Sequence, residues 1–304
     1  MKLFTSNGDN LNQINEKQFN LEKDIQSITE SNMDKVFGLE FVKSEYSLNN
    51  FRIDSLCFDT KTKSFVIIEY KNTKNFSVID QGYSYLSLML NNKAEFVLLY
   101  NELLDKNLRK DDVDWSQSKV IFVSPTYTVY QKESINFKDL PIELWEIKQF
   151  ENNTVMYLPI KATQTTESIN TISSVDSTIS TVSKEVKTYT EEEHLNGLPN
   201  NIIEMYETIK TEILNLGDVT LKPTKQYIAF VGNKKNIVDF VIKKSKIKVY
   251  INLKYSEIDD YKNKVRDVTN IGSWGNGDCE FTYESIDDMD YLLSLVKQSY
   301  KKNG

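Results

Sequence analysis

The pattern of apolar and polar positions divides the first half of the chain into alternating helical and strand-like segments. Between residues 20 and 38, apolar side chains recur at near-helical spacing and Gly38 ends the run, which predicts a helix. Ser77 and Asp80 have the spacing of a capping box ahead of "VIDQGYSYLSLMLNN", which predicts a second helix. Apolar runs predict strands at 41–48, 51–59, 65–71, 95–100, 119–124, 142–150 and 154–160. This order favours a mixed sheet with helices packed against it.

The last third of the chain has its own pattern. An amphipathic helix is expected in "NIIEMYETIKTEILNLG", ending at Gly217. Strands follow in "KQYIAFVGN" and on both sides of the turn "KKSK", then in "CEFTY", before a final helix in "SIDDMDYLLSLVKQSYKK". The pattern predicts a small α+β domain over 191–304, separate from an α/β domain over 1–161.

A change of composition lies between the two predicted domains. In the segment 162–190, about half the residues are Ser or Thr. Such a segment buries too little apolar surface to offset its ordering entropy, so we expect a mobile linker. An edge strand or an exposed helix is the alternative, because "TISTVSKEV" has some β-branched character.

Composition and charge narrow the class of protein. The apolar and charged fractions are those of a soluble globular chain, and no apolar run approaches the ~20 residues of a membrane span. The N-terminus lacks the apolar stretch of a secretory signal, and the two cysteines are far apart, so we expect a cytoplasmic protein without disulfides. A net charge of −7 argues against a generally basic surface but leaves room for a local basic groove.

Four ionisable residues interrupt the two otherwise apolar strands at 51–59 and 65–71: Arg52, Asp54, Glu69 and Lys71. If Asp59 and Ser64 close a hairpin, Asp54 faces Glu69. The same register places three further pairs on that face: Arg52 with Lys71, Leu56 with Ile67, and Phe58 with Phe65. The other face is then also mostly apolar, with Ile53, Cys57, Val66, Ile68 and Tyr70.

The predicted pair of carboxylates requires compensation. Opposed side chains in a hairpin have Cβ atoms ~4.5–5.5 Å apart, so Asp54 and Glu69 would repel unless a proton or a cation lies between them. Mg²⁺ prefers carboxylate, water and phosphate oxygens. Lys71 projects from the same strand face as Glu69 and can meet the negative charge of a phosphate. The geometry suits metal-dependent hydrolysis of phosphodiesters.

The residues Asp54, Glu69, Tyr70 and Lys71 resemble the motif of the PD-(D/E)XK nuclease superfamily, with Ile53 at the position of the nominal proline. Gln81 and Tyr85 fit the Gln-x-x-x-Tyr element of its RecB-like branch, and Glu30 occupies the place of an acidic residue on the first helix. The resemblance, which includes relatives of NucS-type endonucleases, covers approximately residues 15–160. It implies a restriction-endonuclease-like sheet, Asp54 and Glu69 as ligands of Mg²⁺ or Mn²⁺, a catalytic Lys71, and Gln81 and Tyr85 positioning the substrate.

Other interpretations of these residues remain open. The four charges could form a structural salt-bridge network without a metal, and Gln81 and Tyr85 could be ordinary helix residues. Glu30 could be a solvated helix residue. Lysines interleaved with aromatic residues could bind phosphates weakly, although such charges usually mark a solvated face.

The C-terminal domain resembles a domain of unknown function found in proteins often labelled "predicted transport protein", through "LKPTKQYIAF", "KIKVYINL" and "RDVTNIGSWGNGDCEF". Its glycine-rich loop supplies a candidate ligand site at Trp274, Gly275 and Asp278. A tight turn before the strand "CEFTY" is the alternative, and the spacing is not that of a phosphate-binding loop.

Taken together, the motif and its resemblance predict a metal-dependent nuclease that acts on nucleic acid, with DNA favoured over RNA and no membrane partner. The resemblance implies a setting in DNA repair, restriction or phage defence, and a homodimer as a candidate assembly. Two alternatives stay open: a catalytically inactive nucleic-acid-binding module on a nuclease fold, and a protein-interaction module.

Overall fold

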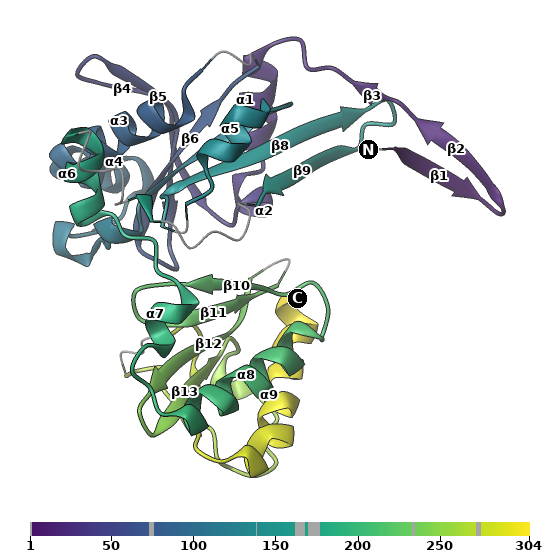
Figure 1. Ribbon diagram of the computed structural model, residues 1–304, viewed down its shortest axis with the longest axis vertical. Helices are drawn as coiled ribbons and strands as arrows, with labels where there is room; N and C mark the ends of the chain where they lie inside the picture. The colour runs from purple at the N-terminus through teal and green to yellow at the C-terminus, as the bar shows by residue number, and fades with distance from the viewer. Residues whose placement is uncertain are drawn as a thin grey trace. The chain divides into compact units, whose positions relative to one another are not determined.

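A computed structural model of the chain describes residues 2–72, 76–137, 139–161, 168–169, 177–232, 235–271 and 275–304. The chain divides into two compact units, Met1–Thr188 and Tyr189–Gly304 (Figure 1). Each unit has its own sheet and its own hydrophobic core.

The first unit is built on a mixed sheet, which confirms the predicted fold class. In its described residues the strand order is β3 (Glu16–Lys17), β8 (Ile142–Phe150), β7 (Lys119–Ser124), β6 (Ser64–Tyr70), β5 (Phe51–Asp59) and β4 (Glu40–Leu48), and β9 (Val155–Ile160) also pairs with β8. β6, β7 and β8 run parallel, while the other pairings are antiparallel. The carboxyl ends of the three parallel strands therefore lie at one edge of the sheet.

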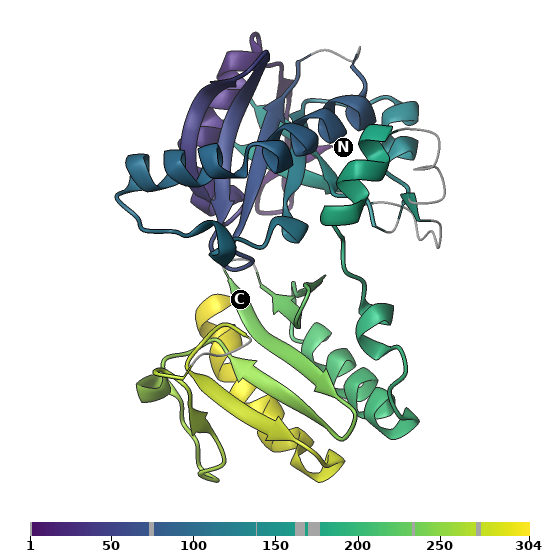
Figure 2. The same cartoon turned by 90° about the vertical axis from the view of Figure 1, so that its left-hand side faces the viewer.

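Helices cover both faces of this sheet. α3 (Val78–Asn91) and α4 (Lys93–Leu104) share a core cluster with Leu56, Phe65 and Phe122, and Figure 2 shows the two blue helices crossing that face. α1 (Glu22–Glu30) and α2 (Met33–Val36) share a second cluster with Val66 and Ile68, which project from the opposite face. The short helices are η1 (Lys110–Asp112), η2 (Trp115–Gln117) and α5 (Val129–Ser134).

Gly82 sets the distance between α3 and the sheet. A Cβ at this position would lie 2.5 Å from Cδ1 of Ile142, at the start of β8. A side chain at residue 82 would therefore require the Ile142 side chain or α3 itself to shift.

The prediction of a strand at 95–100 was wrong, because these residues lie in the middle of α4. A short apolar run fits a buried strand and a buried helix equally well by composition. The helical period appears in the burial: Phe96, Val97 and Tyr100 face the core, whereas Leu98 is 52% exposed.

The predicted hairpin register is confirmed from Ser55 opposite Ile68 to Asp59 opposite Ser64. The ladder ends there, so it does not include the predicted pairs Asp54–Glu69 and Arg52–Lys71. Ile53 departs from the prediction, because it packs in the cluster with Leu56 and not with Cys57. β5 breaks strict alternation at Asp54: the β4–β5 ladder shows no pair there, and Glu45 on β4 has a left-handed φ of 54°. Asp54 therefore lies at an irregular point of the strand.

The structure also corrects part of the predicted linker 162–190. Residues 177–185 form α6 (Ser177–Glu185), whose Ile179 and Val182, followed by Val186, pack into the core of the first unit beside α3. The few apolar residues lie at helical spacing and form a narrow stripe on one face of the helix. The Ser and Thr content of the whole segment, on which the linker prediction rests, does not show this stripe. Residues 162–167 and 170–176 of the predicted linker lie outside the described residues.

The chain begins with a ribbon for which the sequence pattern predicts no element. β1 (Leu3–Asn7) pairs with β2 (Asn10–Ile14) in a separate two-stranded sheet, which projects from the body of the first unit (Figure 1). Its side chains are mostly exposed, including Phe4 and Leu11.

The second unit is the separate small α+β domain that the sequence predicts. Its described strands form an antiparallel sheet in the order β10 (Thr220–Pro223), β11 (Ile228–Val231), β12 (Asn236–Lys243), β13 (Lys246–Ile251), β15 (Cys279–Tyr283) and β14 (Arg266–Asp267). α8 (Asn200–Leu214) and α9 (Met289–Asn303) share the core cluster with the sheet. The short helices are α7 (Glu191–Leu195), η4 (Tyr255–Glu257) and η5 (Ile286–Asp288). Over the described part of the whole chain, no helix has the length and apolar character needed to cross a bilayer.

Val182→Asp tests whether α6 is part of the first unit. Val182 is completely buried, so an unpaired carboxylate there should lower the free energy of unfolding by about 3 kcal/mol. Lys184→Asp, on the exposed side of the same helix, is the control and should change it by less than about 0.5 kcal/mol. Chemical denaturation of both variants makes the comparison, and equal small effects would show that α6 does not pack on the unit.

Candidate active site

The end of the β5–β6 hairpin brings together three of the predicted site residues. Glu69 is only 3% exposed, and its Oε1 accepts a hydrogen bond from Lys71 Nζ at 2.6 Å. Oδ2 of Asp54 accepts the backbone N–H of Tyr70 at 3.0 Å, which ties Asp54 to the strand between Glu69 and Lys71. Lys71 in turn donates its backbone N–H to the carbonyl of Val123 at the end of β7.

Gln81 and Tyr85 reach this point from α3, one helical turn apart. Gln81 Nε2 donates to Glu69 Oε1 at 2.8 Å and lies 3.3 Å from the Tyr85 hydroxyl. That hydroxyl donates to the backbone carbonyl of Arg52 at 3.0 Å, and Tyr85 is only 5% exposed. In this structure Gln81 orients the Glu69 carboxylate, while Tyr85 joins α3 to β5.

Both carboxylates are in an environment that disfavours their charge. Burial, reinforced by the charge of Glu69, raises the pKa of Asp54 to about 7, although the Tyr70 N–H opposes the shift. Burial also raises the pKa of Glu69, against the opposing influence of Lys71. The pair is therefore short of positive charge at neutral pH even with the Lys71 ammonium in place.

The donor set fits a divalent cation. Oε2 of Glu69 is buried and has no hydrogen-bond partner among the described residues, although a buried carboxylate oxygen ordinarily has one. Within those same residues, no group of three or more His, Cys, Asp or Glu could hold a metal ion. Two carboxylates meet the need of Mg²⁺, which completes its shell with water and phosphate oxygens. Asp54 and Glu69 are thus the residues that could hold the metal.

Glu30 is connected to the site indirectly. It ends α1, and its Oε1 accepts from the Ser55 hydroxyl at 2.6 Å and from Gln26 Nε2 at 2.9 Å. Gln26 Nε2 also lies 3.1 Å from the carbonyl oxygen of Asp54. Glu30 therefore fixes α1 to β5 next to Asp54, and its hydrogen bonds to described residues are made with Gln26 and Ser55, not at the carboxylates of Asp54 and Glu69.

Glu22 is an acidic residue of the site that the sequence reasoning missed. Its Oε2 accepts the backbone N–H of Asn72 at 2.9 Å, just after Lys71, and its charge adds to the rise of the Asp54 pKa. Glu22 opens the same helix that Glu30 closes. The sequence identifies the helix but not which of its ends lies nearest the carboxylates.

The alternative interpretation, a structural salt-bridge network of Arg52, Asp54, Glu69 and Lys71, agrees with the structure only in part. Lys71 does pair with Glu69. Arg52, however, is directed to Glu45 on β4, and Arg52 is largely exposed. The described residues thus show no ion pair for Asp54.

The glycine-rich loop of the second unit behaves as a tight turn where it is described. Trp274 lies outside the described residues. Gly277 has a φ of +95°, and a Cβ there would lie 2.2 Å from the carbonyl oxygen of Ile251. Gly275 is similarly close to the ring of Tyr250, and Asp278 makes backbone hydrogen bonds to Leu253 and Val268.

A carboxylate that the sequence reasoning did not select anchors this loop. Asp239 on β12 is fully buried, and its Oδ2 accepts from the backbone N–H and from Nδ2 of Asn276 at 2.6 and 2.9 Å. Its Oδ1 accepts from Asn236 Nδ2 at 3.0 Å. These bonds hold the loop to the sheet.

Comparison with known proteins identifies the family. A protein of Haemophilus influenzae, described as "Uncharacterized protein", is 46% identical over 302 residues, which span 99% of this chain and all of that protein. The chain belongs to the same family as that protein. Residues 191–303 match a domain of unknown function, DUF5655, in agreement with the predicted C-terminal resemblance.

Among solved structures, the one titled "Structure of EndoMS-dsDNA2 complex" has a distant similarity to this chain. The match has 15% identity and a TM-score of 0.23, and it covers 43% of this chain and 47% of that one. The chain thus spans about half the length of that structure. So low a TM-score supports no conclusion about function.

Asp54→Asn tests the electrostatics of the pair. The pKa of Asp54 rises from 3.8 in the unfolded chain to about 7 in the folded protein. Between pH 3.8 and pH 7, the folded protein therefore keeps a proton on Asp54 that the unfolded chain has already released. Ionised Asp54 therefore costs stability as the pH rises through 7. Asp54→Asn should increase the free energy of unfolding at pH 8 and have little effect at pH 4. Denaturation curves across this range give the comparison, with exposed Asp111→Asn as the control. A gain that does not change with pH would contradict the assignment.

Proposed function

We propose that the first unit is a metal-dependent phosphodiesterase that hydrolyses nucleic acid. The observation that supports this most directly is the pair of the half-buried Asp54 and the buried Glu69, with the unpaired Oε2 of Glu69 and the ammonium of Lys71 beside it. The stability of the fold gains nothing from two carboxylates withdrawn from water when only one of them, Glu69, is paired with a cation. A site that binds a divalent metal and a phosphate would use all three groups.

Each residue has a distinct task in this proposal. Asp54 and Glu69 would hold Mg²⁺ or Mn²⁺, which when bound lowers the pKa of water and polarises the phosphate. Gln81 keeps the Glu69 carboxylate in position, and Tyr70 does the same for Asp54 through its N–H. Lys71 places its charge where the phosphate becomes more negative, as a water oxygen bonds to phosphorus and the bond from phosphorus to the leaving oxygen breaks.

DNA is the proposed substrate because the motif resembles that of the PD-(D/E)XK nucleases, whose setting would be repair, restriction or defence against foreign DNA. A second copy of the chain would be needed if one site cuts one strand of a duplex.

Cleavage of labelled DNA and RNA with Mg²⁺, Mn²⁺ or EDTA tests the activity. Glu69→Gln and Lys71→Ala should each reduce metal-dependent cleavage by at least about 100-fold, because each removes an interaction made with the reacting phosphate or its metal. Glu102→Gln, on the exposed side of α4, should cut like the wild type. Failure of the wild type on every substrate would argue for the inactive binding module instead.

Thermal unfolding with and without metal tests the ligand set separately from activity. Mg²⁺ that binds the folded state alone stabilises it by about 2.7 kcal/mol at 100 times its Kd. The Tm of the wild type should therefore rise with Mg²⁺ at pH 8, while that of Asp54→Asn should not. Equal shifts in both proteins would place the metal elsewhere.

A further inference from the structure

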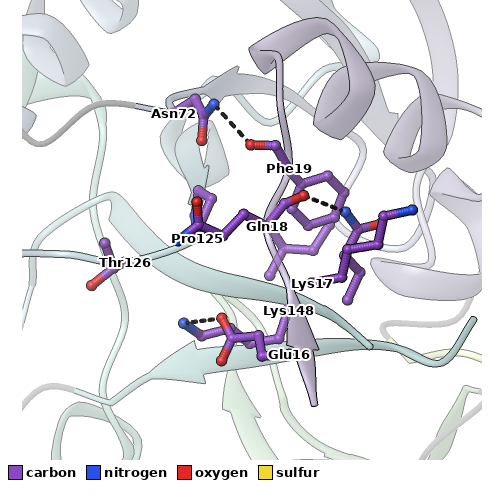
Figure 3. A pocket seen from close by; sticks show the side chains of 10 residues that line it. Glu16, Lys17, Gln18, Phe19, Asn72, Pro125, Thr126 and Lys148 are labelled. Carbon is purple, nitrogen blue, oxygen red and sulfur yellow. Dashed lines mark hydrogen bonds and ion pairs between the residues drawn. The ribbon is translucent and has the colours of Figure 1, made fainter. Parts of the chain in front are cut away.

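A pocket opens at the same sheet edge as the carboxylate pair. It has a volume of about 340 Å³, near the lower limit of the ~300–1,000 Å³ typical of small-molecule sites. Asn72 follows β6, Pro125 and Thr126 follow β7, and Gln149 lies in the last part of β8. The pocket thus lies at the carboxyl ends of the three parallel strands. Residues 16–19 and 147–149 complete its lining (Figure 3).

Amide side chains give the pocket hydrogen-bonding groups without charge. Nε2 of Gln149 donates to the carbonyl of Gln18 at 2.9 Å, and Nδ2 of Asn72 lies 3.4 Å from the carbonyl of Phe19 (Figure 3). The opposite amide oxygens, and the whole side-chain amide of Gln18, have no hydrogen-bond partner in the part of the chain that the structure describes. Gln18 thus keeps a donor and an acceptor, and Asn72 and Gln149 each keep an acceptor oxygen. Groups of this kind can pair with the edge of a nucleobase.

The rim of the pocket carries one uncompensated positive charge. Lys148 is paired with Glu16 at 3.0 Å. Lys17 is exposed and makes no ion pair with any described residue. A single lysine beside a neutral polar pocket suits one phosphate rather than a highly charged ligand.

Asn72 connects the pocket with the surroundings of the carboxylate pair. The side chain of Asn72 lines the pocket, while its backbone N–H binds Glu22, whose charge acts on Asp54. Only Lys71 at the strand end separates Glu69 and Tyr70 from Asn72. A chain whose phosphate lies at the carboxylate pair would therefore reach the pocket within its next units.

We propose that this pocket binds one unpaired nucleotide of the substrate, its base against Gln18 and Gln149 and its phosphate at Lys17. The inference rests on the proposed function and narrows it. A base that is stacked and paired in a duplex can enter such a pocket only after it leaves the stack, which costs a few kcal/mol. The favoured substrate is therefore a single strand, an end or a loop, where no base pair has to be broken next to the cut.

Binding measured without metal tests the pocket independently of cleavage. The full-length protein is titrated in EDTA against labelled single strands of dA, dC or dT at several salt concentrations. Lys17→Ala should weaken binding to all three several-fold and reduce the salt slope by about 0.7, the contribution of one phosphate contact. Gln18→Ala should change the ranking of the three bases and leave the slope unchanged. Lys110→Ala, an exposed lysine outside the pocket lining, is the matched control for Lys17→Ala.

The outcomes separate this inference from the proposed function. Binding by both pocket variants that equals the wild type would overturn the pocket assignment, even if the protein cleaves DNA with metal. The expected slope and ranking changes without any cleavage would support the pocket and contradict the nuclease. Free deoxynucleoside monophosphates that compete as well as the strands would overturn its assignment to a nucleotide within a chain. Because Lys17 and Gln18 are exposed, unchanged Tm values should show that both variants fold.

Discussion

The constraint on which the arrangement of the first unit depends is the burial of two neighbouring carboxylates, partial for Asp54 and nearly complete for Glu69. Asp54 and Glu69 lie at the end of one hairpin, where burial opposes the charge of both. Neighbouring elements place polar groups around the pair. The end of β6 supplies the N–H of Tyr70 and the ammonium of Lys71, and α3 supplies the amide of Gln81. α1 supplies a further negative charge, that of Glu22. An environment that raises the energy of two anions is costly for folding and suited to binding a cation.

Local pattern predicted the framework well. The hairpin register follows from the positions of Asp59 and Ser64, and it holds over the whole paired length. The capping residue Ser77 begins α3 as expected, accepting the N–H of Asp80. Because α3 starts there, Gln81 and Tyr85 face the β-hairpin, as their spacing of one turn implies. The sequence thus predicts contacts correctly where a single turn or a single strand register determines which residues lie side by side.

The remaining features depend on contacts between distant segments. The helix at 95–100 and the packing of α6 are decided by which side chains find the core, which composition does not show. Glu22 reaches Asn72 only because α1 lies along the sheet in one of its two orientations. The pocket is made by four separate segments, so no single stretch of sequence indicates it.

Gly82 affects the position of a candidate site residue as well as the packing of α3. It stands next to Gln81 on a helix whose distance from the sheet is limited by Ile142. A methyl group at this position would require either the Ile142 side chain or α3 to shift, and a shift of α3 would carry the Gln81 amide away from Glu69 with every polar group still present. An apolar contact between the helix and the sheet thus bears on the reach of the neighbouring polar side chain, and a residue without any functional group belongs among the determinants of the site.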